Sequence, residues 1–183
     1  QEIDRISSLV PVREIEREDG RVALVTTTGA VLLDGPPARF GFRASHTIVA
    51  ETTLDSGALS GLTLNGKTVA TEGAGSPLGD GELSVLFALR DDAAVTAQAG
   101  LDALARDLVE RFSDPAVDAT LAAGAPGLFT DGGLAFDATK EAGLAGRIAL
   151  NAAVDPDQGG ALTRLRDGIG AGAAGPSGNA QLL

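Results

Sequence analysis

The sequence contains no cysteine, methionine, tryptophan or tyrosine, so phenylalanine supplies all of its large aromatic side chains. Without cysteine the chain forms no disulfide and offers no thiolate to a substrate or a metal ion. Only 3% of its 183 residues are aromatic, whereas 44% are hydrophobic. The core must therefore be built from aliphatic side chains, which favours helix and sheet packing over deep aromatic pockets.

Positive charge is also scarce. The formal net charge is -11 and the isoelectric point lies near 4.4. Such a chain repels nucleic acid and anionic membrane surfaces, so we expect neither as a partner. No apolar run approaches the roughly 20 residues that span a bilayer. The first ten residues, QEIDRISSLV, also lack the basic and long apolar regions of a secretory signal.

Both ends of the sequence look like parts of helices. QEIDRISSLV has the spacing of a helix that is finishing, and PSGNAQLL has the composition of one that is beginning. We interpret the chain as a fragment trimmed inside elements at both ends, with ordinary frayed termini as the alternative. Such a fragment is expected to be monomeric by itself.

The longest predicted element is a helix from Asp80 to Phe112, in which apolar residues recur every three or four positions. This spacing places them along one stripe of the helix, and most charged residues fall outside that stripe. Asp80 is expected to cap the helix, and Gly100 to mark a bend or a close helix crossing. A helix of this length needs partner helices. The candidate residues of this packing or assembly stripe are Leu83, Leu86, Ala97, Leu101, Leu104, Leu108 and Phe112.

Residues 12 to 69 have the pattern of short β-strands separated by turn residues. Asp19-Gly20 and Asn65-Gly66 are hairpin signals between alternating segments. Further strands are expected in TGAVLLDG, ARFGFRA and HTIVAETTL. Together with a preceding helix that ends at Pro11, these segments predict a small antiparallel sheet or sandwich.

The remaining sequence is rich in glycine. Residues 71 to 81 are expected to form a flexible connector, and Asp114-Pro115 to end the long helix. Residues 117 to 147 form a loop-rich segment, and GLAGRIALNAAV is either a strand or a short buried helix. The predicted fold class is α+β: a small antiparallel β module joined to a helical stem built around one long helix.

The motifs that resemble chemical sites are better explained as structure. Residues 170 to 175 spell GxGxxG, but no strand precedes them and a proline follows, so we interpret them as a linker. Asp155 opens a calcium-like loop whose twelfth position is Arg166 instead of glutamate. His46, the only histidine, has no GxSxG elbow to serve. We therefore expect no catalytic, cofactor or metal site.

Four stretches carry a family resemblance. They are DRISSLVPVREIEREDGRVALVTTTGAVLLDG, GDGELSVLFALRDD with LDALARDLVERF, GAPGLFTD and SGNAQLL. In this order they resemble the flagellar hook-associated protein 1 family, the hook–filament junction proteins of bacterial flagella. The chain departs from the family at Ser113, where asparagine is common. It also leaves no room between Phe129 and Ile148 for the large β insertion of longer relatives.

The resemblance implies a structural subunit without enzymatic activity that joins hook to filament. Its implied partners are further copies of itself, the hook protein and the second junction protein, with an export chaperone for the full-length protein. It implies an extracellular position on the flagellum, reached through the flagellar secretion system without a cleaved signal peptide. The corresponding domains are the end of a stem helix (1–10), the β module (11–79) and the long helix with its return to the stem (80–183).

Two other functions are compatible with the sequence. The strands between residues 12 and 69 could form an extracellular binding or adhesin-like module. A small hydrolase built around His46 or a carboxylate pair is the third hypothesis, although the missing tryptophan and tyrosine disfavour sugar substrates.

Overall fold

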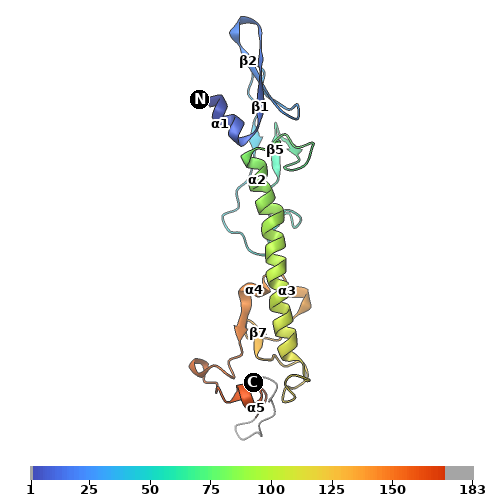
Figure 1. Ribbon diagram of the computed structural model, residues 1–183, viewed down its shortest axis with the longest axis vertical. Helices are drawn as coiled ribbons and strands as arrows, with labels where there is room; N and C mark the ends of the chain where they lie inside the picture. The colour runs from blue at the N-terminus through green and yellow to red at the C-terminus, as the bar shows by residue number, and fades with distance from the viewer. Residues whose placement is uncertain (1, 172–183) are drawn as a thin grey trace. The chain divides into compact units, whose positions relative to one another are not determined.

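The computed structural model describes residues 2–171 and has the predicted α+β class (Figure 1). The chain divides into two compact units, residues 1–96 and 97–183, and each is described by itself. No described helix combines the length and the apolar character needed to cross a membrane. The domain boundaries expected after residues 10 and 79 remain a prediction.

The first unit begins with helix α1 (Glu2–Leu9). It ends just before Pro11, as predicted, because proline has no backbone N–H to continue the hydrogen-bond ladder. Val10 donates its N–H to the carbonyl of Ile6 at 2.8 Å, and its side chain is buried. The end of α1 is therefore part of the core of this unit.

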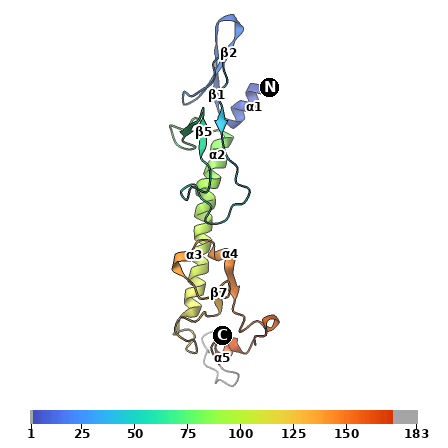
Figure 2. The same cartoon turned by 180° about the vertical axis from the view of Figure 1, so that it is seen from behind.

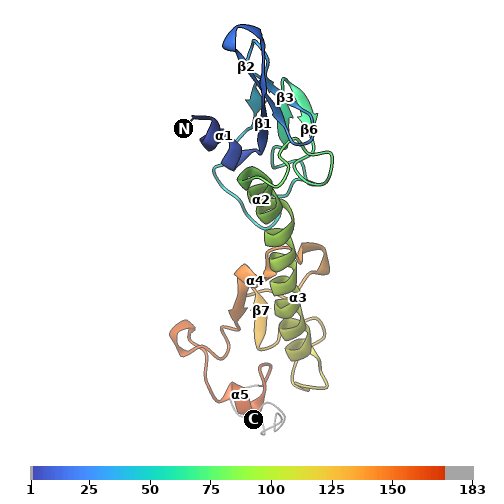
Figure 3. The same ribbon diagram turned by 45° about the horizontal axis from the view of Figure 1, so that its top comes forward.

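Three antiparallel strands follow in the order β1-β2-β3 (Figure 3). They are β1 (Val12–Glu16), β2 (Val22–Thr26) and β3 (Val31–Leu33). The predicted turn between β1 and β2 is a short 3₁₀ helix, η1 (Glu18–Gly20), closed by a bond from the Arg17 N–H to the Arg21 carbonyl at 2.8 Å. The hairpin prediction is confirmed.

A second three-stranded sheet is formed by β4 (Phe40–Gly41), β5 (Leu62–Leu64) and β6 (Lys67–Val69), also antiparallel. Asn65 and Gly66 make the two-residue turn between β5 and β6, with φ angles of 51° and 78°. Asparagine and glycine are the residues that tolerate this left-handed region best. This predicted hairpin is confirmed as well.

The strand expected in HTIVAETTL is wrong, because residues 46 to 54 form an irregular loop with a turn at residues 50 and 51. The Thr52 N–H donates to the Val49 carbonyl at 2.9 Å, and the Val49 N–H donates to the Thr52 hydroxyl at 3.2 Å. Thr53 and Ser56 bond to each other in the same way. These local side-chain bonds occupy the backbone groups that a strand would pair with a neighbour.

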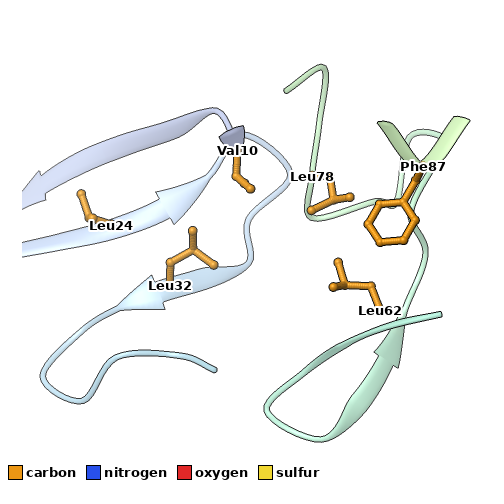
Figure 4. Close-up of a cluster of buried hydrophobic side chains, with 6 residues drawn as sticks. All are labelled: Val10, Leu24, Leu32, Leu62, Leu78 and Phe87. Carbon is orange, nitrogen blue, oxygen red and sulfur yellow. The ribbon is translucent and has the colours of Figure 1, made fainter. Parts of the chain in front are cut away.

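The core of the first unit joins α1, both sheets and the start of the long helix (Figure 4). Residues 71–81, predicted to be a flexible connector, are packed only in part: residues 72–75 are exposed, whereas Leu78 is fully buried and the Ser76 carbonyl accepts a bond from the Thr28 hydroxyl. The buried side chains of this core are Val10, Leu24, Leu32, Leu62, Leu78 and Phe87.

The long helix runs without a break from Glu82 to Ser113. It consists of α2 (Glu82–Ala88), a π-helical turn η2 (Leu89–Ala93) and α3 (Ala94–Ser113). The predicted stop at Asp114-Pro115 is confirmed, because α3 ends one residue before it.

The start of this helix corrects the sequence prediction. Its N-cap is Gly81, and Asp80 makes no capping bond. Gly81 is buried, and a methyl group on its Cα would collide with the carbonyl of Leu9 and with Pro11. The close approach of two backbones thus excludes a larger cap. Gly100 does not mark a close helix crossing in the described chain. A Cβ atom added at this position would have no neighbouring atom within 4 Å.

In the second unit, residues 97–113 of α3 accompany a two-stranded antiparallel sheet, β7 (Phe129–Asp131) with β8 (Ile148–Leu150) (Figure 2). The short helix α4 (Leu144–Arg147) runs directly into β8. The ambiguous stretch GLAGRIALNAAV is therefore helix first and strand second.

The described part of this unit also contains three single-turn helices: η3 (Ala138–Lys140), η4 (Pro156–Gln158) and α5 (Arg164–Asp167). Asp137 precedes η3 and Asp155 precedes η4, and each carboxylate accepts the N–H two residues further on. The aspartate of the calcium-like loop is therefore a turn cap.

Candidate assembly surface

The predicted stripe is divided between the two units. In α2, Leu83 packs against the core, whereas Leu86 is 51% exposed. In the part of α3 within the second unit, Leu101 and Leu104 are 56% and 60% exposed. Ala97 is exposed as well. Most of the stripe is therefore open to solvent in the described structure.

The two remaining stripe residues are partly covered. Leu108 is half-buried, and the ring of Phe112 lies 5.2 Å from that of Phe129 in an edge-on arrangement. This geometry is the preferred one for aromatic pairs. It ties the end of α3 to the first residue of β7.

The covered face of α3 lies one position away from the exposed stripe. It consists of Gln98, Asp102, Ala105 and Val109, with the latter three buried. Their spacing of four, three and four is the same as that of residues 97, 101, 104 and 108. The second unit thus covers one helix face and leaves Leu101 and Leu104 of the adjacent face exposed.

Asp102 is the central polar residue of the covered face. Its carboxylate accepts bonds from the N–H groups of Gly143 and Ala145, both at 2.8 Å, and from the Gln98 amide at 2.9 Å. Burial by itself raises the pKa of Asp102, but these bonds and the charge of Arg147 together lower it below its usual value. The ionised carboxylate thus holds the start of α4 against α3.

Two ion pairs reinforce this attachment. The Arg106 guanidinium donates from Nη1 to both oxygens of Glu141, at 2.7 and 2.9 Å. Arg147 pairs with Asp131 at 2.7 Å and also donates to the carbonyl of Ala142. The segment after residue 137 is therefore fixed by charged groups as well as by the buried side chains of Leu144 and Val154.

A second buried carboxylate, that of Asp118, likewise accepts backbone N–H groups and lies in the loop after α3. It accepts the backbone N–H of Thr120 at 2.9 Å and that of Ile169 at 2.8 Å. Ile169 is itself 5% exposed. This bond joins the loop after α3 to a segment 51 residues later in the sequence.

The first unit contains an apolar cavity of about 370 Å³ between the second sheet and α2. Arg90 lies beside it, with its guanidinium carbon 4.8 Å from the centre of the Phe87 ring and 5.5 Å from that of Phe42. Arg90 is also paired with Asp91 and donates to the Ser60 carbonyl at 3.2 Å. The other lining residues are Phe40, Leu62, Leu83 and Leu86.

The candidate chemical motifs do not assemble into a catalytic site in the part of the chain that the structure describes. His46 is exposed in a loop. Among residues 2–171, no group of three or more histidine or carboxylate side chains could hold a metal ion. Gly172 and Gly175 of the GxGxxG motif lie outside the described residues, as does the SGNAQLL stretch.

Sequence reasoning missed Asp102, Asp118 and Arg90. Asp102 falls outside the predicted apolar stripe with other charged residues, although its spacing with Ala105 and Val109 marks a second face. Asp118 carries a weaker signal, the Asp-x-Thr pattern typical of a carboxylate that caps its own turn. Phe87, three residues before Arg90, is the local signal for its aromatic contact, whereas Phe42 lies far away in the sequence.

Residues 1–128 match the family model described as "Flagellar hook-associated protein FlgK helical domain". The matched region contains all of the first unit and α3. Comparisons with curated proteins and with solved structures gave no match.

Proposed function

Because the chain belongs to the family of the flagellar hook-associated protein FlgK, we propose that it is a structural subunit that joins the hook of the bacterial flagellum to the filament. The family is one of structural flagellar proteins, and membership associates the chain with the axial proteins of the flagellum. The match over residues 1–128 is the observation that carries this proposal.

We further propose that the exposed stripe of α3 packs against helices of neighbouring axial subunits. Leu101 and Leu104 are apolar, more than half exposed and aligned on one helix face. The adjacent face is already covered within the second unit, whereas Leu101 and Leu104 remain exposed there and are available to a partner. Its spacing of four and three residues is that of helix-to-helix seams.

The proposed partners are further copies of the chain, the hook protein and the second junction protein, with a chaperone before export. The proposed location is outside the cell, reached through the flagellar secretion system without signal cleavage. The division into stem end, β module and stem return, at residues 1–10, 11–79 and 80–183, belongs to the same proposal. The adhesin-like alternative has no support from the comparisons.

A deletion strain tests the junction role. Cells that lack the gene should assemble hooks but shed filament protein into the medium, and the intact gene should restore attached filaments. Electron microscopy of the cell surface and an immunoblot of the medium measure both results. Normal filaments on the deletion strain would refute the proposal.

The stripe has its own test in the same strain. Complementation with the double variant Leu101→Asp and Leu104→Asp should fail to restore filaments, because two buried charges would oppose helix packing. Leu134→Asp is the matched control, since Leu134 is 71% exposed and lies outside the stripe. Equal recovery with both variants would exclude the stripe as an assembly surface.

A further inference from the structure

The apolar cavity of the first unit is open on one side. Three residues of its wall remain well exposed: Phe42 at 53%, Leu86 at 51% and Phe40 at 40%. Exposed apolar side chains gathered around one hollow are typical of a binding surface rather than of scattered surface residues. The cavity is therefore suited to bind an apolar group.

The same unit carries a loop of residues 43–60 that has an apolar tip. Its base is closed, because the Ser45 hydroxyl donates to the Ala58 carbonyl at 3.5 Å and the Arg43 N–H donates to the Ser60 hydroxyl at 3.1 Å. At its tip, Ile48 and Val49 are 58% and 55% exposed. Compact loops with closed ends often serve recognition. This tip is not used in the packing of its own unit.

The charges around the two features are opposite. Residues 39–43, which include two of the cavity's phenylalanines, carry Arg39 and Arg43 and no acidic residue. Residues 46–55 carry Glu51 and Asp55 and no lysine or arginine. All four of these charged residues are exposed.

Arg43 lies at the Arg90 end of the cavity. Its backbone N–H bonds to the hydroxyl of Ser60, whose carbonyl accepts the Arg90 guanidinium. Arg90 is already neutralised by Asp91, so the cation available to a partner there is Arg43. A partner that places an apolar side chain in the cavity and a carboxylate beside Arg43 would match both features.

We propose that a second copy of this chain is that partner: Ile48 and Val49 of one subunit enter the apolar cavity of the next, and Glu51 lies against the neighbour's Arg43. The contact joins two different patches, so each subunit offers one free tip and one free cavity, and copies can add in series. This inference goes beyond the junction role, because it assigns a contact between copies that is independent of the α3 stripe.

The contact is small compared with an interface of about 800 Å² per partner that holds a stable dimer. We therefore expect the isolated chain to be monomeric when dilute and to associate only at high concentration. In an assembly that already holds the subunits side by side, a raised effective concentration makes the same contact persistent.

Disulfide trapping tests the proposal, because the chain contains no cysteine of its own. Val49→Cys and Leu86→Cys chains are mixed at about 1 mM, where a contact of millimolar Kd is substantially occupied, and then oxidised. The matched control replaces Leu86→Cys by Val85→Cys, since Val85 is 63% exposed on the same helix but does not line the cavity. The expected result is about tenfold more mixed dimer with Leu86→Cys, because a disulfide requires close and correctly directed Cβ atoms.

Charge reversal provides the second arm. Glu51→Arg in the Val49→Cys chain, or Arg43→Glu in the Leu86→Cys chain, should each reduce the mixed dimer about two- to fivefold. Combining the two reversals should restore it. Circular dichroism of each variant verifies folding before it is mixed.

Three results would overturn the proposal. The first is equal trapping at positions 86 and 85, and the second is trapping between two Leu86→Cys chains in preference to the mixed pair. The third is protection of Cys at position 86 by another axial protein, with no mixed dimer in its absence. The α3 stripe variants should not change the trapping yield, so failure here is distinguishable from failure of the junction role.

Discussion

Asp102 shows how one buried charge determines the path of a distant segment. Its carboxylate faces the backbone N–H groups of Gly143 and Ala145, more than 40 residues away in the sequence. All three groups that bond its carboxylate are donors, so the ionised form is the one that fits. An apolar residue at this position would leave two buried N–H groups without acceptors, which is unfavourable.

Replacing Asp102 should therefore destabilise the second unit. Asp102→Asn puts an amide N–H₂ where a carboxylate oxygen accepts a bond, and we expect a loss of about 2–4 kcal/mol in the free energy of unfolding. Asp107→Asn is the control, since Asp107 is exposed on the same helix. Urea denaturation monitored by circular dichroism measures both variants, and a loss no larger than the control's would contradict this role.

The same residue predicts a dependence on acid. Because the folded-state pKa of Asp102 lies below the unfolded value, its contribution is fully present above about pH 4 and is lost as the pH falls through the lower folded-state pKa. Wild-type stability should therefore drop more steeply than that of Asp102→Asn below pH 4. If the stability of the two proteins fell equally with pH, Asp102 would not be the cause of the acid dependence.

Two glycines of the long helix should respond in opposite ways to alanine. Gly81→Ala should cost about 1–3 kcal/mol, because the new methyl group meets the Leu9 carbonyl and Pro11. Gly100→Ala should stabilise by up to about 1 kcal/mol, since its site is exposed and alanine favours the helix. Thermal unfolding of both variants provides the comparison; a shift of the same sign in each would refute it.

At the scale of the element, α3 has two apolar faces with different roles. Val109 is fully buried on one, and Leu104 is 60% exposed on the other. Helices of globular proteins usually have one such stripe, and a second one indicates a partner. The two faces can be separated by mutation because they share no residue.

Truncation should distinguish the faces in the isolated chain. Val109→Ala should reduce the free energy of unfolding by about 1–3 kcal/mol, whereas Leu104→Ala should change it by about 0.5 kcal/mol or less. In cells, the effects of the two substitutions should be reversed: the stripe substitution should impair filament attachment, whereas Val109→Ala should not. An equal loss of stability from both substitutions would mean that Leu104 is already buried within the isolated chain.

The elements most accurately predicted are those with local signals. Pro11 ends α1, Asn65-Gly66 forms its hairpin and Asp114-Pro115 follows the end of α3, and each depends on neighbouring residues alone. Residues 47–54 were assigned to a strand from their β-branched content, but threonine and serine hydroxyls bond the local backbone there. Gly81 displaced Asp80 as the cap because Leu9, a residue distant in sequence, lies against it.

The candidate surface was predictable in part. The apolar period of the long helix contains all seven stripe residues, and several of them are exposed. Periodicity alone could not separate the exposed face from the covered one, because the covered face includes a charged residue, Asp102. Its burial depends on backbone donors that arrive only after the chain has returned along α3.

For the whole molecule, the separate cores of the two units imply separate cooperative behaviour. The first unit is held by an aliphatic cluster with Phe87, whereas the second combines buried aliphatic side chains such as Leu144 and Val154 with buried carboxylates and ion pairs. Hydrophobic burial and charge-assisted bonds respond differently to acid and salt. The two units should therefore differ in their sensitivity to solvent conditions.

Differential scanning calorimetry should resolve this difference. We expect Gly81→Ala to shift the transition of the first unit and Asp102→Asn that of the second, each by several degrees and with little effect on the other. Lowering the pH to about 3 should shift the second transition more, because the unfolded chain takes up a proton at Asp102 more readily than the folded one. A single transition that both variants shift equally would show that the chain unfolds as one unit.

The π-helical turn η2 has a consequence for comparing sequences. A π-turn holds one residue more per turn than the α-helix around it. A relative with an uninterrupted α-helix would need one residue fewer between Leu86 and Ala97 to present the same side chains on the same faces. Alignments of this family should therefore show a one-residue gap at positions 89–93. Heptad positions counted continuously from α2 through η2 into α3 are therefore misassigned. The heptad count must restart after Ala93.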